Sequence, residues 1–249
     1  MNLISGATGL VAPFAVYTVT RKSWPAKSYA KRFLGCAFSC SPDGHLATCS
    51  HVVQEIMEDQ MLVVQHLTEN QCHKAEILAH HSRYDVAFLK IKAKTQNWPS
   101  PIFEEQLLAS TVWAYGLYDS IIEKGNISCI PQVFSGTITA TPRRLDGLAT
   151  DAPFYQVSFP SLPGFSGAPL YVNLKHGSAV CGMMFQNRTT EIVLRDVMEY
   201  KDEKIHFSEK HVRGWDAGVA HTSSCILRAA TELNIPIWKS PQPGVPPDR

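Results

Sequence analysis

PGFSGAP, at residues 163–169, is the stretch of this chain that carries the most structural information. Ser166 stands between two glycines, and apolar segments typical of β-strands flank the stretch on both sides. A serine hydroxyl becomes a strong nucleophile only when a neighbouring base takes its proton and N–H groups stabilise the resulting oxyanion. Glycine permits the sharp backbone turns that such a loop requires. The stretch therefore predicts a nucleophile loop centred on Ser166.

A candidate base and a candidate orienting acid lie upstream. Residues Gly35–Val53 have the pattern of a β-hairpin, in which an apolar strand and a Ser-Pro-Asp-Gly turn precede a second short strand. His51 stands where that second strand ends and a short helical turn begins. Asp85 opens an alternating, mostly apolar strand that runs to Ile91. The order along the chain is therefore histidine, aspartate, serine.

These motifs, in this order, resemble the chymotrypsin-like (trypsin-fold) serine proteases. The likeness is greatest to the branch without disulfides, such as HtrA/Deg-type domains and bacterial trypsin-like proteins, and it spans about residues 10–235. The motifs that carry it are Thr48-x-x-His51, Asp85-x-Ala87-x-Leu89 and Gly164-x-Ser166-Gly167-x-Pro169. The resemblance implies a serine endopeptidase that cleaves protein or peptide substrates without a cofactor or metal.

The resemblance also implies a role for each residue. Ser166 would attack the scissile carbonyl, and His51 would act first as general base and then as general acid. Asp85 would hold the imidazole in the correct tautomer and stabilise its charged form. The backbone N–H groups of Gly164 and Ser166 would form the oxyanion hole.

A rival class of serine hydrolase does not fit. The nucleophile elbow of the α/β-hydrolases requires the pattern G-x-S-x-G, and Ala168 occupies the place of its last glycine. In that fold the serine also precedes the acid and the histidine along the chain, which is the reverse of the order here.

Short apolar segments separated by turn signals predict an all-β fold of two six-stranded antiparallel β-barrels with a short C-terminal helix. The first six expected strands are Ala15–Thr20, Leu34–Ser39, Leu46–Thr48, Met61–His66, Lys74–His80 and Val86–Ile91. The second six are Val112–Tyr115, Gln132–Thr141, Phe154–Phe159, Ala168–Val172, Ala179–Phe185 and Asp216–His221. Ser223–Leu233 has the pattern of an amphipathic helix. We expect lobes at residues 1–107 and 108–239 and a proline-rich tail at 240–249.

The specificity pocket is also located by resemblance. The residue six positions before the nucleophile, Pro160, would line its base, and no acidic group stands there. The walls would come from Gly182, Met183, Met184 and Gly218. Because these positions are uncharged, we expect the pocket to take a small or medium hydrophobic residue rather than lysine or arginine.

Composition excludes several other classes of function. The net charge of +1 gives no electrostatic basis for binding nucleic acid or an anionic membrane, and no apolar run is long enough for a transmembrane helix. The seven cysteines include no C-x-x-C pair. Free, buried thiols in a reducing compartment are the simplest interpretation, so we expect a cytoplasmic protein without a metal site. The basic residues near the N-terminus follow the apolar run, which argues against an export signal.

Two features of the sequence bear on how the protein is regulated. Phe165 stands where trypsin-like zymogens carry the aspartate that pairs with a new N-terminus, so activation by N-terminal cleavage is not expected. Residues 190–214 are longer and more charged than a hairpin needs, and they form either a solvated surface excursion or a docking segment for an activating protein partner. The chain ends too early for the PDZ domain of HtrA-type proteins, which suggests a regulated effector protease. The alternative is a catalytically silent trypsin-fold module that binds proteins.

Overall fold

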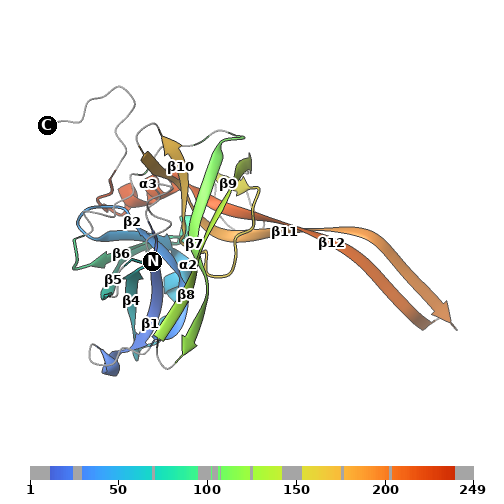
Figure 1. Ribbon diagram of the computed structural model, residues 1–249, viewed down its shortest axis with the longest axis horizontal. Helices are drawn as coiled ribbons and strands as arrows, with labels where there is room; N and C mark the ends of the chain where they lie inside the picture. The colour runs from blue at the N-terminus through green and yellow to red at the C-terminus, as the bar shows by residue number, and fades with distance from the viewer. Residues whose placement is uncertain are drawn as a thin grey trace.

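Most of the chain that the computed structural model describes is β-strand (Figure 1). The described residues are 12–24, 30–68, 71–94, 102, 106, 108–123, 126–141, 153–174, 177–201 and 204–238. The tail at 240–249 and most of residues 95–107, at the end of the first expected lobe, lie outside them.

The first six strands close into a barrel in the order β1-β2-β3-β6-β5-β4. They are β1 (Phe14–Thr20), β2 (Ala30–Ser39), β3 (His45–Cys49), β4 (Gln60–His66), β5 (Cys72–His81) and β6 (Val86–Ile91). Apolar residues of these strands, such as Phe38 and Leu89, are fully or almost fully buried in the barrel interior. This hydrophobic burial is the main source of stability for a small barrel.

The second six strands close into another barrel, in the order β10-β11-β12-β9-β8-β7. They are β7 (Thr111–Glu123), β8 (Asn126–Ala140), β9 (Phe154–Val157), β10 (Pro169–Leu174), β11 (Gly177–Lys201) and β12 (Lys204–Thr222). Every strand pair in both barrels is antiparallel. The predicted fold of two six-stranded antiparallel barrels is therefore confirmed.

Two α-helices and two 3-10 turns complete the described structure: α2 (Ser50–Gln54), α3 (Ser223–Glu232), η1 (Arg21–Ser23) and η2 (Ser82–Tyr84). The Thr222 hydroxyl caps α3 by accepting a hydrogen bond from the N–H of Cys225. Ile226, Ala229 and Ala230 form its buried face. The predicted C-terminal helix is confirmed, and it ends at Glu232 because Leu233 has left the helical backbone conformation.

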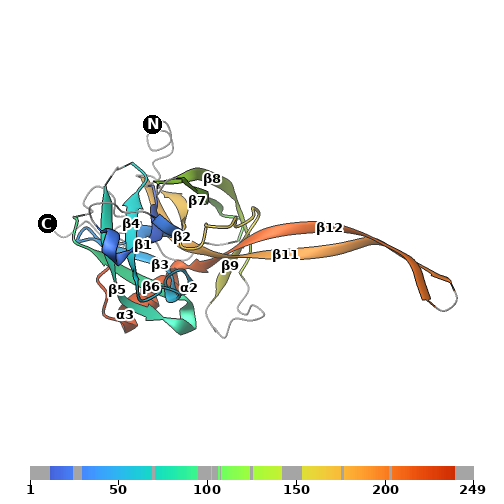
Figure 2. The ribbon, with the colours of Figure 1, turned by 90° about the horizontal axis from the view of Figure 1, so that it is seen from below.

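Beyond the second barrel, β11 and β12 continue as a two-stranded ribbon that projects far from the body (Figures 1 and 2). The pairing continues from Gly182 opposite Thr222 to Lys201 opposite Lys204. We call residues 189–216 the β11–β12 arm. For residues 190–214 the sequence predicts a surface excursion or a docking segment but no strands, because the charged residues interrupt the apolar alternation that identifies a half-buried strand.

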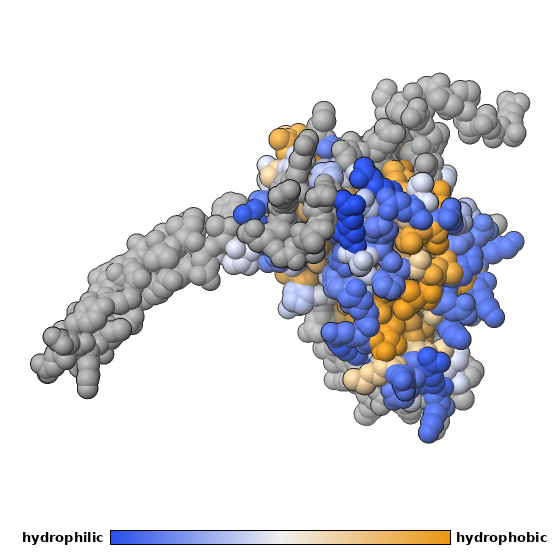
Figure 3. Space-filling view, turned by 180° about the vertical axis from the view of Figure 1, so that it is seen from behind, coloured by the Kyte–Doolittle hydropathy of each residue, from blue (hydrophilic) through white to orange (hydrophobic). Residues whose placement is uncertain are grey.

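The core joins the two barrels rather than filling each one separately. One cluster of buried side chains includes Phe38 and Phe88 from the first barrel together with Phe154 and Phe185 from the second. On the outer surface, apolar residues form a band bordered by hydrophilic ones on the face shown in Figure 3. Within the described part of the chain, no helix has the length and hydropathy needed to span a membrane.

Candidate active site

His51 lies on α2, immediately after β3, and Asp85 lies just before β6. Because β3 and β6 are neighbours in the barrel, the two residues come together. Asp85 has a left-handed backbone conformation with φ of 50°, and its carbonyl accepts a hydrogen bond from the N–H of Ser50 at 2.9 Å. This turn directs the carboxylate at His51, where Oδ1 accepts from the backbone N–H at 2.9 Å and Oδ2 lies 2.7 Å from Nδ1. The ring of His51 remains 45% exposed.

The environment of Asp85 favours its charged form. Burial by itself raises the pKa of this carboxyl, but the imidazoles of His221 and His51 outweigh burial and hold the pKa well below its ordinary value of 3.8. The side chain of Asp85 is only 13% exposed. A buried carboxylate held against Nδ1 fixes the tautomer of His51 and leaves Nε2 as the proton acceptor.

Two consecutive tight turns form the loop that carries Ser166. The N–H of Phe165 donates to the carbonyl of Leu162 at 2.9 Å, and the N–H of Ala168 donates to the carbonyl of Phe165 at 2.8 Å. The third residue of each turn is a glycine with positive φ, +91° at Gly164 and +87° at Gly167. Glycine at that position is the signature of a type II turn. The loop therefore presents Ser166 at the second position of its second turn.

The same turns leave two N–H groups available beside the nucleophile. The N–H groups of Phe165 and Gly167 donate to backbone carbonyls. Those of Gly164 and Ser166 donate to no acceptor within the part of the chain that the structure describes. The N–H groups of Gly164 and Ser166 can therefore both donate to a substrate oxyanion, which is what an oxyanion hole with two donors requires.

Cys36, on β2 of the first barrel, ties this loop in place. Its backbone N–H donates to the carbonyl of Ser166 at 2.8 Å, and its thiol donates to the carbonyl of Gly164 at 3.2 Å. The thiol also accepts from the N–H of Leu117 at 3.3 Å. Sequence reasoning missed this role, because Cys36 appears in the sequence only as one more apolar position in a strand.

Ser166 itself adopts a resting position. Its hydroxyl donates to the carbonyl of Phe185 on β11 at 3.3 Å, and no hydrogen bond joins it to His51 in the described structure. Catalytic hydrogen bonds commonly tighten only when substrate binds. The structure thus pairs His51 with Asp85 directly and places Ser166 on a loop fixed to the same barrel.

The residues expected in the specificity pocket separate into two groups. Gly218 donates its N–H to the carbonyl of Phe159, and a Cβ there would lie 2.7 Å from the Met184 methyl carbon. Gly218, Met184 and the half-buried Pro160 lie close to the nucleophile loop, where the carbonyl of Met184 accepts a hydrogen bond from the N–H of Gly167. Gly182 and Met183 lie on β11 between β10 and β12, where Gly182 pairs with Leu170 and Met183 pairs with Pro169, the last residue of the nucleophile stretch.

Asn187, which the sequence analysis did not select, joins the two sides of this region. Its side-chain oxygen accepts a hydrogen bond from the N–H of Ser161 at 3.1 Å. Asn187 lies on β11, two residues after the carbonyl that holds Ser166, whereas Ser161 lies on the loop before the nucleophile. The bridge therefore crosses from β11 to the nucleophile loop.

Cys49, His51 and Asp85 are close enough that one metal ion could contact all three, because their donor atoms lie within 4.8 Å of one another. Burial, with a smaller contribution from the Asp85 charge, raises the pKa of the Cys49 thiol well above its ordinary value. A protonated thiol is a poor metal ligand. The chemistry of this set therefore fits a proton-transfer pair better than a metal site.

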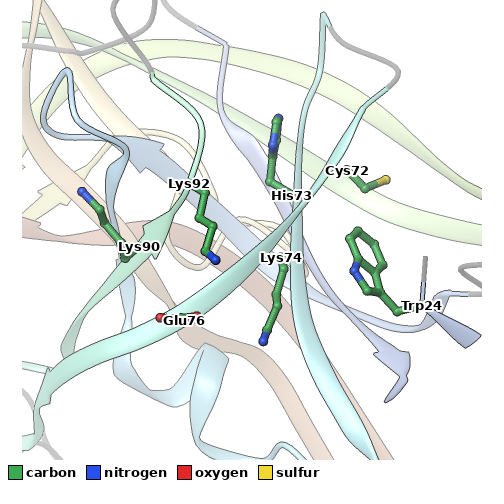
Figure 4. Close-up of a pocket in the computed structure, with 7 residues that line it drawn as sticks. All are labelled: Trp24, Cys72, His73, Lys74, Glu76, Lys90 and Lys92. Atoms are coloured by element: carbon green, nitrogen blue, oxygen red, sulfur yellow. The ribbon is translucent and has the colours of Figure 1, made fainter. Parts of the chain in front are cut away.

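A separate depression of about 310 Å³ lies on the first barrel (Figure 4). It is lined by Trp24, Cys72, His73, Lys74, Glu76, Lys90 and Lys92. The lysine amines point in different directions instead of converging, and Lys90 donates to the carbonyl of Asp43 at 2.6 Å. None of the candidate catalytic residues lines this depression.

Comparisons with known proteins find relatives of this chain. The family model described as a trypsin-like peptidase domain matches residues 35–183. An uncharacterized protein, y4bJ of Sinorhizobium fredii, is 31% identical over 142 residues. A DegP-like protein of Pseudomonas savastanoi pv. phaseolicola, named a "probable periplasmic serine endoprotease", is 31% identical over 143 residues. Each match covers 55% of this chain, but only 20% and 26% of the respective relative.

Solved structures show the same fold at lower identity. The HtrA-type protease AlgW, solved with a decapeptide, superposes with a TM-score of 0.60 at 19% identity, covering 92% of this chain and 66% of AlgW. Rv3671c of M. tuberculosis, solved as an inactive serine-to-alanine mutant, gives a TM-score of 0.54 at 17% identity, covering 94% of this chain and 91% of that one.

Proposed function

The chain belongs to the trypsin-like peptidase family, and from this we propose that it is a serine endopeptidase with His51, Asp85 and Ser166 as its catalytic triad. The observation that carries the proposal is that the Asp85 carboxylate makes two hydrogen bonds with His51, one to its backbone N–H and one to Nδ1 of its ring. A histidine held in this way has Nε2 available for a proton. The nearby serine loop, with two unused N–H groups, supplies the rest of the site.

In the proposed reaction, the Ser166 hydroxyl leaves the carbonyl of Phe185 and donates to Nε2 of His51. Its oxygen attacks the scissile carbonyl as His51 takes the proton. The N–H groups of Gly164 and Ser166 stabilise the oxyanion, an effect worth about 2.7–4 kcal/mol per donor in other enzymes. The imidazolium then protonates the leaving amine, and water hydrolyses the acyl-enzyme by the same steps.

We further propose that the residue before the scissile bond is small or medium-sized and hydrophobic. The Met184 side chain occupies the space beside Gly218, and the bridge from Asn187 to Ser161 narrows the region further. An uncharged site of this shape favours alanine, valine or leucine over arginine. Asn187→Ala would widen the site and shift the preference toward larger residues.

The compartment and the regulation are also proposals. Six cysteines form no disulfide in the described part of the structure, and five of them are buried, which suits a reducing cytoplasm. We propose that a protein partner activates the enzyme through the β11–β12 arm. Support comes from the continuity of β11, which holds Ser166 through Phe185 and then extends into the arm.

Fluorogenic peptides that differ only at the residue before the cleavage site test the proposed activity. We expect the wild type to hydrolyse the alanine, valine and leucine peptides, and Ser166→Ala to lose at least about 10³-fold in kcat. Equal hydrolysis by the variant would exclude Ser166 as the nucleophile. Cleavage mainly after lysine or arginine would overturn the specificity proposal alone. A folded wild type that hydrolyses no peptide and reacts with no serine-directed probe would favour the silent binding module.

A further inference from the structure

A second histidine, His221 on β12, approaches Asp85 from within the second barrel. Its side chain is fully buried, and its Nε2 lies 3.7 Å from Oδ2 of Asp85. The same carboxylate oxygen lies 2.7 Å from Nδ1 of His51. Asp85 therefore stands between two imidazoles, one partly exposed and one enclosed.

Aromatic rings fix the orientation of His221. Its ring stacks on Phe185 with centroids 4.0 Å apart and planes 17° apart, and it packs at 5.6 Å against Phe154. Phe185 is the residue whose carbonyl holds the Ser166 hydroxyl. His221 thus contacts both the acid and the strand segment beside the nucleophile.

The buried nitrogens of His221 need an explanation. Neither Nδ1 nor Nε2 has a hydrogen-bond partner within ordinary distance in the described structure. Leaving a buried polar group without a hydrogen-bond partner destabilises the folded protein. A phenylalanine would fill the same aromatic space without this cost. Asp85 is the acceptor that Nε2 faces, and an approach of roughly 0.7 Å would bring the pair to ordinary hydrogen-bond distance.

We propose that His221 is a positioning residue, which presents its Nε2–H to Oδ2 of Asp85 and holds that carboxylate in the place and charge state that His51 requires. The inference rests on the proposed serine protease function.

Charge considerations agree with a neutral His221. Burial lowers its pKa, and although Asp85 raises it, burial prevails. The titratable groups that face it are Asp85 and His51, whereas Phe154 and Phe185, which pack against its ring, are uncharged. A neutral ring donates one hydrogen bond without repelling the imidazolium that forms on His51 during the reaction.

Two variants distinguish the effect of the N–H donor of His221 from the effect of its aromatic ring. His221→Phe keeps the aromatic stack and removes the N–H, whereas His221→Gln carries an amide that can donate from about the same place. We expect kcat of His221→Phe to fall roughly tenfold, with little change in KM, on the scale seen when a group that orients a functional histidine is removed. The acidic limb of its pH profile should move to higher pH, because an Asp85 charge without this donor favours protonated His51 more strongly. His221→Gln should recover most of kcat.

A control and a readout without catalysis complete the test. His66 on β4 is also buried against a phenylalanine, but it bonds Thr68 and the Ala12 carbonyl rather than Asp85. His66→Phe should therefore lower the melting temperature without moving the pH profile. In Ser166→Ala protein, which needs no activity, the low-field NMR resonance of the proton between His51 and Asp85 should shift on adding His221→Phe and not on adding His66→Phe.

The possible outcomes distinguish the role of His221 from the proposed protease function. A resonance shifted by His221→Phe in the Ser166→Ala background, together with a folded wild type that hydrolyses no peptide, would support the role of His221 and contradict the proposed protease function. An unchanged resonance, together with an unchanged pH profile, would overturn the role of His221 even if the enzyme cleaves peptides.

Discussion

The N–H of Cys36 donates to the carbonyl of Ser166 at 2.8 Å, and this bond joins the first barrel to the nucleophile loop of the second. The contact is so close that Gly167 has no space for a side chain, because a Cβ there would collide with the carbonyl of Cys36. Its φ of +87° independently disfavours other residues.

Gly167→Ala should therefore destabilise the protein by at least about 2 kcal/mol and lower its melting temperature by about 4–8 °C. Gly214→Ala on the β11–β12 arm is the matched control, since no atom lies within 4 Å of a Cβ built at Gly214. It should stay within about 0.5 kcal/mol of the wild type. Equal thermal shifts for the two variants would contradict the close contact at Cys36.

Asp85 should make stability depend on pH in the acid range. Its pKa in the folded protein lies below 3.8, so its charge stabilises the fold fully above about pH 5, and this contribution declines as pH falls below about 4. Asp85→Asn should cost about 1–3 kcal/mol at pH 7, and the difference from wild type should shrink toward pH 3.

Urea unfolding at several pH values measures that difference. Asp216→Asn, which changes an exposed carboxylate that accepts a hydrogen bond from Thr189, is the control and should follow the wild type throughout. A stability difference for Asp85→Asn that is the same at pH 7 and pH 3 would show that its charge is not what stabilises the fold.

Thiol reactivity should follow burial. Burial raises the pKa of Cys40 to about 12, and it raises the pKa of Cys181 as well. Among the six cysteines whose burial the structure describes, alkylation of the folded protein at pH 8, mapped by peptide mass, should modify the half-buried Cys72 first. The five buried thiols should react only after unfolding. Rapid modification of Cys40 or Cys181 in folded protein would contradict the packing described here.

The β11–β12 arm should be dispensable for folding, because it projects from the body and an isolated two-stranded ribbon adds little stability (Figure 2). Thr189 and Asp216 are paired directly opposite each other. An Asn-Gly turn can therefore replace residues 190–215. The shortened protein should melt within about 4 °C of the wild type and retain basal hydrolysis. A shortened protein that does not fold would show that the arm is part of the core.

Much of the fold follows from local pattern. The strand from Val86 to Ile91 is predicted with its observed ends, because alternating apolar residues and flanking turn signals are local features. The helix that begins at Ser223 is predicted for the same reason. The sequence does not predict the strands of the arm. These two strands pair only with each other, so they lack the apolar alternation of a strand in a buried sheet.

The candidate active site likewise contains residues that the sequence predicts and residues that it does not. His51, Asp85 and Ser166 stand in recognisable motifs, and the structure pairs the first two directly. The groups that support them are non-local: Cys36 and His221 act on residues far away along the chain, so neither has a motif. Chain topology alone brings them to the nucleophile loop and to Asp85.

The most direct test of the central claim is labelling with a fluorophosphonate, which reacts with activated serines. Wild type, Ser166→Ala and Ser161→Ala would be compared, followed by mass mapping of the labelled peptide. Ser161 is the control because it is a second serine on the same loop, buried where Ser166 is half-buried. The account predicts one label, on Ser166, in the wild type and in Ser161→Ala, and none in Ser166→Ala. A label that persists in Ser166→Ala, or folded wild type that takes no label, would contradict it.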